Sequence, residues 1–151
     1  MAGRKISVMR TTLRPRLYRD IEIPSDKTLY ALAEAITRAF GFDFDHAFGF
    51  YSKLKGHIYD SPIKYELFVD MGERGDSKAR GVKRTRIAEA FPSVGAKMTF
   101  LFDYGDEWPF RVELIGQSET TAGLKYPRVI KSVGEAPDQY PDPDDEDYDE
   151  E

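Results

Sequence analysis

The 151-residue chain contains no cysteine, which excludes a disulfide framework, a thiolate nucleophile and a zinc-thiolate site. No segment approaches the ~18 consecutive apolar residues of a membrane span. The N-terminal stretch MAGRKISVMR also lacks the continuous apolar core of a signal peptide. We therefore expect a soluble, cytoplasmic protein without a membrane partner.

Catalytic and nucleotide-binding motifs are also missing. His46 and His57 are the only imidazoles, and neither lies in an HExxH or H-x-H pattern. No serine lies in a G-x-S-x-G turn, and GERGDSKARG lacks the Gly-Lys-Ser/Thr ending of a phosphate-binding loop. The sequence predicts no cofactor, and it leaves open whether the protein is an enzyme, with a non-catalytic role favoured.

Charge is distributed unevenly along the chain. Nine of the 27 acidic residues lie in the last 14 positions, and the remaining 18 acids against 22 basic residues leave the body at about +4. The run PDPDDEDYDEE cannot bury enough apolar surface to offset the entropy of ordering it. We therefore expect one α+β domain over residues 1–137 and an acidic, disordered tail over residues 138–151.

Residues 98–115, MTFLFDYGDEWPFRVELI, predict a β-hairpin. Apolar side chains alternate with others on both sides of a short polar break, as in strands that bury one face. Gly105, Asp106 and Glu107 have the composition of a three-residue hairpin loop. A loop centred on Asp106 predicts four cross-strand pairs, namely Tyr104–Trp108, Phe102–Phe110, Phe100–Val112 and Met98–Leu114.

The rest of the chain predicts a mainly antiparallel, mixed sheet packed against one long helix and one or two short helices. Strands are expected at residues 5–13, 16–23, 47–51, 65–70 and 128–132, and a short helix at 86–91. The long helix is expected to begin at an N-cap on Ser25, to run through Phe40 and to stop at Gly41. Its apolar stripe consists of Leu29, Leu32, Ala33, Ile36 and Phe40.

Several of these segments together carry a family resemblance. RLYRDIEIPSDKTLYALAEAITRAFGF, TRIAEAF, LFDYGDEWPFRVELIG and KYPRVIKSVGEAPDQYP resemble the Ri-plasmid ORF-three-like family, whose members occur on plasmids, as passengers of insertion-sequence elements and in chromosomes. The resemblance implies an α+β fold and no established activity. Many relatives carry a second histidine where this chain has Phe48, and a cysteine within the segment that here reads Glu135 to Gln139. A metal role resting on those positions is correspondingly weaker here.

The hairpin tip is the first candidate site. It gathers carboxylates and aromatic rings that could bind a hard cation, hold a basic side chain or accept a proton. Turn geometry and core packing also explain these residue types, and we favour that interpretation. The candidate residues are Asp103, Tyr104, Asp106, Glu107 and Trp108. His46 is included as a residue that the fold could bring next to them.

His46 itself allows two interpretations. It is either an ordinary loop histidine that hydrogen-bonds a carbonyl, which we favour, or part of a site assembled in space with Asp43, Asp45 or the hairpin acids. Which metal, if any, such a site would hold is left unknown by the sequence.

The second candidate site is a cluster of cations in the glycine-bearing segment 71–86. Such a cluster can neutralise several phosphates, while exposed aromatic rings can stack on bases. A solvated charge run is the competing explanation, because an excess of about +4 is modest for a DNA-binding domain. The candidate nucleic-acid-binding residues are Lys78, Arg80, Lys83, Arg84 and Arg86.

Two functions follow from these candidates. The favoured one is a binding module that engages nucleic acid or a basic protein partner and uses the acidic tail as an electrostatic regulator. The alternative is a small metal-assisted hydrolase that uses the acidic hairpin tip. The sequence does not define the oligomeric state, and a monomer is assumed.

Overall fold

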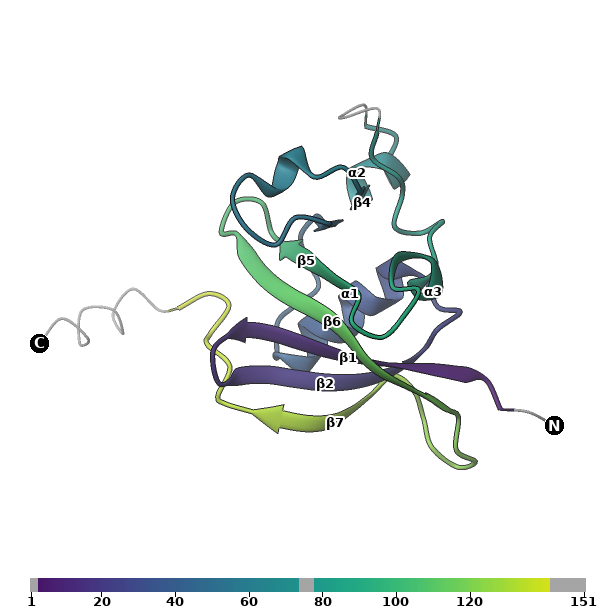
Figure 1. The fold of residues 1–151 in the computed structure, drawn as a ribbon. Helices are drawn as coiled ribbons and strands as arrows, with labels where there is room; N and C mark the ends of the chain where they lie inside the picture. The colour runs from purple at the N-terminus through teal and green to yellow at the C-terminus, as the bar shows by residue number, and fades with distance from the viewer. Residues whose placement is uncertain (1–2, 74–77, 142–151) are drawn as a thin grey trace, which may run out of the picture.

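The computed structural model describes residues 3–73 and 78–141, which form a seven-stranded sheet with helices against it (Figure 1). The strand order is β4-β3-β5-β6-β1-β2-β7, and all six neighbouring pairs are antiparallel. The predicted α+β class is confirmed. In chain order the elements are β1 (Lys5–Arg14), β2 (Leu17–Pro24), α1 (Leu29–Ala39), β3 (Phe48–Tyr51), the 3-10 helix η1 (Ile58–Asp60), β4 (Lys64–Glu66), α2 (Leu67–Asp70), α3 (Ile87–Ala90), β5 (Lys97–Phe102), β6 (Trp108–Glu119) and β7 (Arg128–Val133).

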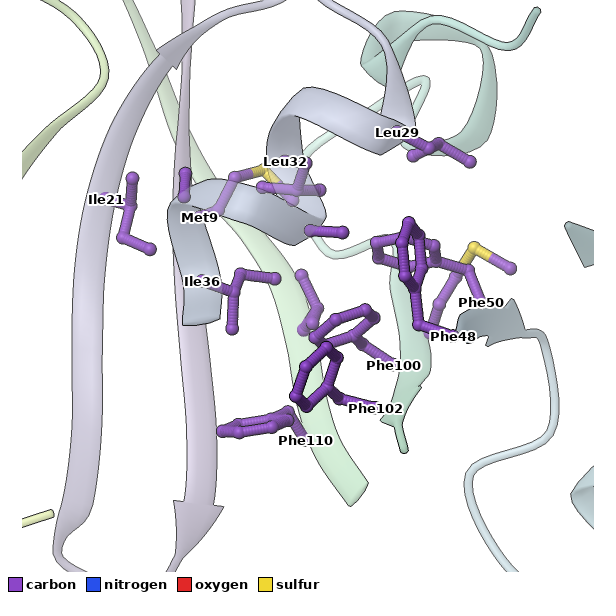
Figure 2. Packing of buried hydrophobic residues seen from close by; sticks show 14 of the residues in the cluster. Met9, Ile21, Leu29, Leu32, Ile36, Phe48, Phe50, Phe100, Phe102 and Phe110 are labelled. Atoms are coloured by element: carbon purple, nitrogen blue, oxygen red, sulfur yellow. The ribbon is translucent and has the colours of Figure 1, made fainter. Parts of the chain in front are cut away.

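Helix α1 covers one face of the sheet and forms the core with it. The predicted stripe of α1 is fully buried against apolar side chains from the strands. Figure 2 shows Leu32 and Ile36 from this helix beside Met9, Ile21 and the phenylalanines of β3, β5 and β6. The ring centroids of Phe100 lie 4.8 Å from Phe50 and 5.6 Å from Phe110, within the range of favourable aromatic contacts.

The hairpin over residues 98–115 forms, but the predicted register is wrong by one pair. Phe102 lies opposite Trp108, and Phe100 lies opposite Phe110. The loop therefore spans the five residues Asp103–Glu107, and Asp103 leaves the strand with a positive φ of 67°. Its Oδ1 accepts hydrogen bonds from the N–H groups of Gly105 (3.0 Å) and Asp106 (3.2 Å), which replace strand pairing. A shift of two residues keeps every side chain on its predicted face, so the buried apolar rows are as expected.

Element boundaries also differ from prediction, most of all at the start of α1 and after β4. Thr28 rather than Ser25 caps α1, because the Ser25 hydroxyl is buried 2.6 Å from the Ser7 hydroxyl while Thr28 accepts the Ala31 N–H. The strand expected over residues 65–70 ends at Glu66, where its pairing with β3 stops, and continues as helix α2. The short helix expected at 86–91 is confined to Ile87–Ala90.

The face of the sheet away from α1, which we call the outer face, carries a row of charged side chains. Charged residues of alternating sign follow one another across five strands at paired positions. Opposite charges at such cross-strand positions attract each other. From β7 to β5 this row contains Lys131, Asp20, Arg10, Glu113 and Lys97.

The predicted boundary between body and tail is not tested over its whole length. Residues 142–151 lie outside the described part of the chain, so the expected disorder stays a prediction. Within residues 138–141, Gln139 is buried, and its Oε1 accepts the Asp43 N–H at 2.7 Å. Contacts with the body therefore extend beyond residue 137.

Candidate functional site

The predicted hairpin-tip residues separate onto the two faces of the sheet. Asp103 is buried beside His46, whereas Tyr104 packs against Phe68 at a ring distance of 4.9 Å. Asp106 and Glu107 are exposed at the loop itself. Trp108 joins the core through Phe42 at 4.9 Å, as the structural interpretation expected, and its buried Nε1 has no hydrogen-bond partner among the described residues.

His46 lies at the centre of a polar cluster on the Asp103 side. Its Nε2 is 3.4 Å from Asp103 Oδ2, 3.7 Å from Asp45 Oδ1 and 2.6 Å from the Tyr140 hydroxyl. Tyr140 in turn donates to Asp45 Oδ2 at 2.9 Å. Partial desolvation and this hydrogen bond raise the pKa of Tyr140 to about 12. The assembly in space of His46 with Asp45 and a hairpin acid therefore occurs.

The segment that brings Tyr140 to His46 could not be found from the sequence. Gln139 Nε2 donates to the Asp43 carbonyl and to Asp45 Oδ1, both at 3.2 Å. These contacts join residues more than 90 positions apart, and the surrounding prolines and acids gave no periodic pattern that could indicate them. Through Tyr140 this segment contacts the histidine, whose side chain remains 39% exposed.

The metal-assisted alternative has no supporting geometry at this cluster. Within residues 3–73 and 78–141, no group of three or more histidine, aspartate or glutamate side chains is arranged to hold a metal ion. The nitrogen of His46 that faces the acids is already within hydrogen-bonding distance of Tyr140. We therefore do not propose a hydrolytic reaction at the hairpin tip.

On the outer face, Tyr104 takes part in a buried tyrosine pair. Its hydroxyl is 2.7 Å from that of Tyr51, which donates to Glu66 Oε2 at 2.5 Å. Gly49 leaves room for this arrangement, since a Cβ there would lie 2.7 Å from the Tyr104 hydroxyl. Burial and the hydrogen bonds to Glu66 and Tyr104 raise the pKa of Tyr51, and burial raises the pKa of Tyr104. Both phenols are therefore protonated at neutral pH.

The predicted basic cluster is only partly brought together. Arg80, Lys83 and Arg84 line one cavity of about 600 Å³ together with Asp70, Thr85 and Glu89. Lys78 and Arg80 line a second hollow of about 230 Å³ next to β4. Arg86 does not line either of these hollows.

The cations of the larger cavity project from a well-anchored segment. Asp70 accepts the N–H groups of Val82 (2.7 Å) and Lys83 (3.1 Å), so its carboxylate is already hydrogen-bonded by the loop. Gly81 is required at this point, because a Cβ would come 2.5 Å from Asp70 Oδ1. The Val82 carbonyl accepts the Tyr30 N–H at 3.2 Å, which ties the segment to the start of α1.

No helix in the described part of the chain is long and apolar enough to cross a membrane.

The fold is shared with a solved protein of unknown function. The crystal structure of MM3350 from Methanosarcina mazei Go1 matches with a TM-score of 0.70 and 18% sequence identity, over 86% of this chain and 70% of that one. At this identity the likeness concerns the fold alone.

No curated protein matches the chain. The model of one family, described as plasmid pRiA4b ORF-3-like protein, matches residues 4–142. Because this match spans nearly all of the sequence, the chain belongs to the plasmid pRiA4b ORF-3-like protein family.

Proposed function

We propose that this protein is a binding module that engages the phosphate backbone of nucleic acid through its basic cavity. The basic cavity is the hollow of about 600 Å³ lined by Arg80, Lys83 and Arg84. The observation that carries the proposal is the convergence of these three exposed cations on one concave surface. Several cations on one surface bind a polyanion by neutralising phosphates and releasing counterions.

The acids of the basic cavity are hydrogen-bonded to backbone N–H groups, and the three cations outnumber the two acids. Asp70 already accepts two backbone N–H groups, and Glu89 Oε1 accepts the Arg86 N–H at 3.2 Å. The side chains of Arg80, Lys83 and Arg84 form no ion pair within 4.0 Å among the described residues. Their charge is therefore available to a ligand. Lys83 also lies 4.8 Å from the ring of Tyr30, which holds the ammonium at the edge of the cavity.

The acidic C-terminal segment supplies a competitor within the same chain. Residues 142–151 contain eight carboxylates, and they follow directly on the residues that are bonded to His46 and Asp43. A tethered polyanion competes with a nucleic acid for the same cations. We propose that this segment weakens nucleic-acid binding at low salt.

Fluorescence anisotropy with labelled single- and double-stranded oligonucleotides over a salt series tests the binding function. For duplex DNA, the triple variant Arg80→Gln/Lys83→Gln/Arg84→Gln should lower the slope of log K against log salt by ~0.9 for each phosphate that is no longer neutralised. The matched control is Lys97→Gln/Lys125→Gln/Lys131→Gln, which removes the same charge elsewhere. Equal loss of affinity in both triple variants, or no binding by the intact chain at low salt, contradicts the proposal.

A chain ending at Pro141 tests the regulatory role of the acidic segment. It should bind the same oligonucleotide at least ~10-fold more tightly at about 50 mM salt, and the difference should shrink as salt rises. A full-length variant in which the eight carboxylates are replaced by amides is the control for length. Unchanged affinity in both forms would show that the segment does not regulate binding.

A further inference from the structure

A groove on the outer face of the sheet has no role in the binding function proposed above. Two hollows, of about 340 and 290 Å³, adjoin each other and share Leu54, Thr99 and Pro109 in their linings. We call the two hollows together the outer groove. It lies between the β1–β2 turn, the start of β6 and residues 54–59. The volume of the larger hollow is within the range of small-molecule sites.

Two arginines distinguish the outer groove from the rest of this face. Arg14 and Arg111 both line the larger hollow, and their side chains make no hydrogen bond or ion pair with any described residue. By contrast, Arg10 binds Asp20 through two hydrogen bonds of 2.9 Å, and Arg128 binds Glu22 at 2.7 Å. Arginines with available donors beside an apolar floor suit a planar anion, because the guanidinium binds carboxylate-like groups through paired N–H donors.

The floor of the groove indicates the rest of the ligand. Leu54 and Pro109 offer apolar surface beside the two arginines. Thr99 adds little polarity, because its hydroxyl already donates to the Lys53 carbonyl at 2.8 Å. Apolar surface next to a few convergent polar groups is the usual composition of a site for a small organic molecule. A ligand body that covers this floor would also exclude water from the arginines and strengthen their hydrogen bonds.

We propose that the outer groove binds a small aromatic anion, with its ring on Leu54 and Pro109 and its acidic group between Arg14 and Arg111. Lys55 adds a further cation at the far end of the groove, where Glu107 is the only acid among the described residues that line it. The net charge of the lining therefore favours an anion. None of these residues lines the basic cavity. Evidence against binding in the outer groove would therefore not contradict the nucleic-acid function, and the reverse also holds.

Binding of 1-anilinonaphthalene-8-sulfonate, a fluorescent aromatic sulfonate, tests the outer groove in the full-length protein. Saturable fluorescence enhancement is expected, and Arg14→Gln/Arg111→Gln should weaken the dye's affinity at least ~10-fold, as for the loss of charged hydrogen bonds. The control Lys97→Gln/Lys131→Gln removes equal charge from the same face and should leave the affinity unchanged. Since all four side chains lie at the surface, their replacement should preserve the thermal unfolding curve.

Two further probes separate the parts of the proposal. The uncharged analogue N-phenyl-1-naphthylamine should bind more weakly than the sulfonate, and 1-naphthoate should displace the dye where inorganic phosphate does not. Equal affinity of the two dyes, or equal affinity of wild type and the double arginine variant, overturns the proposal. Tighter dye binding by the chain ending at Pro141, reversed by a peptide of residues 142–151, would show that the acidic segment is the occupant and would also overturn it.

Discussion

The two faces of the sheet are stabilised in different ways. On the face toward α1, Phe100 is fully buried among Phe48, Phe50, Phe102 and Phe110. On the outer face, polar groups meet in specific pairs, while Arg14 and Arg111 have no partner among the described residues. A register shift of two residues keeps apolar side chains on the buried face, whereas an ion pair exists only when one particular residue lies opposite. The largest single contributions to stability are therefore expected on the first face, whereas the second face carries the differences in pairing that can serve binding.

The largest expected effect is on the apolar face. Phe100→Ala should lower the free energy of unfolding by about 3–5 kcal/mol, because a fully buried ring is removed and a cavity remains. Denaturant unfolding followed by circular dichroism measures this change. Phe100→Leu, which keeps more of the volume, should cost less than the alanine variant. If Phe100→Ala costs under about 1 kcal/mol, the core is not organised around this ring.

The buried tyrosine pair shows that part of the outer face also contributes stability. Tyr51→Phe should cost about 1–3 kcal/mol at neutral pH, because Glu66 loses its donor and the Tyr104 hydroxyl loses its partner. The same unfolding measurement applies, with Tyr59→Phe as a control whose hydroxyl makes no hydrogen bond among the described residues. Similar stability in both variants would mean that the pair is solvated.

The same tyrosines predict a loss of stability in alkali. Their folded-state pKa values are raised, so above about pH 10 the unfolded chain releases protons that the folded chain keeps. Below pH 10 these two tyrosines should not change the free energy of unfolding. Above pH 10 they should lower it as the pH rises. Tyr51→Phe should flatten this fall in unfolding experiments between pH 9 and 11. An unchanged slope in the variant would assign the alkaline sensitivity to other groups.

Arg10 is an outer-face arginine with a buried acidic partner. Arg10→Gln should destabilise the protein by about 1–2 kcal/mol, because the side chain of Asp20 is 5% exposed and would lose its partner, while the part-exposed arginine limits the effect. Equilibrium unfolding at low and at high salt measures it. The effect should persist in high salt, since the carboxylate is shielded from solvent. A change that disappears with salt would show a solvent-exposed pair.

The smallest effect is expected at Arg111. Arg111→Gln should change the free energy of unfolding by less than about 0.5 kcal/mol, because this exposed side chain has no described partner. Thermal unfolding of the variant beside wild type suffices to measure it. A larger loss of stability would show that Arg111 has a structural partner and is not available to a ligand in the outer groove.

Much of the fold could be predicted from local patterns. The stripe of α1, the stop at Gly41 with its φ of 75° and the alternating rows of β5 and β6 each depend on residues close together in the chain. The hairpin register could not be predicted, because Asp103 supplies side-chain hydrogen bonds to the loop that compete with strand pairing. The expected strand 65–70 also ends early, and the side chain of Asp70 accepts the N–H group of Val82, 12 residues further along the chain.

The candidate sites show the same division. Arg80, Lys83 and Arg84 are near neighbours in the sequence and line one cavity. Counting charges along the chain was therefore enough to predict that they form a cluster. The contacts of Gln139 and Tyr140 with Asp43, Asp45 and His46 join distant residues, and no local pattern predicts them. The sequence by itself determined the elements, the buried faces and the distribution of charge, because these follow from short-range periodicity. Only the tertiary structure decided which charges are paired and which line a groove, because pairing depends on the register of strands far apart in the chain.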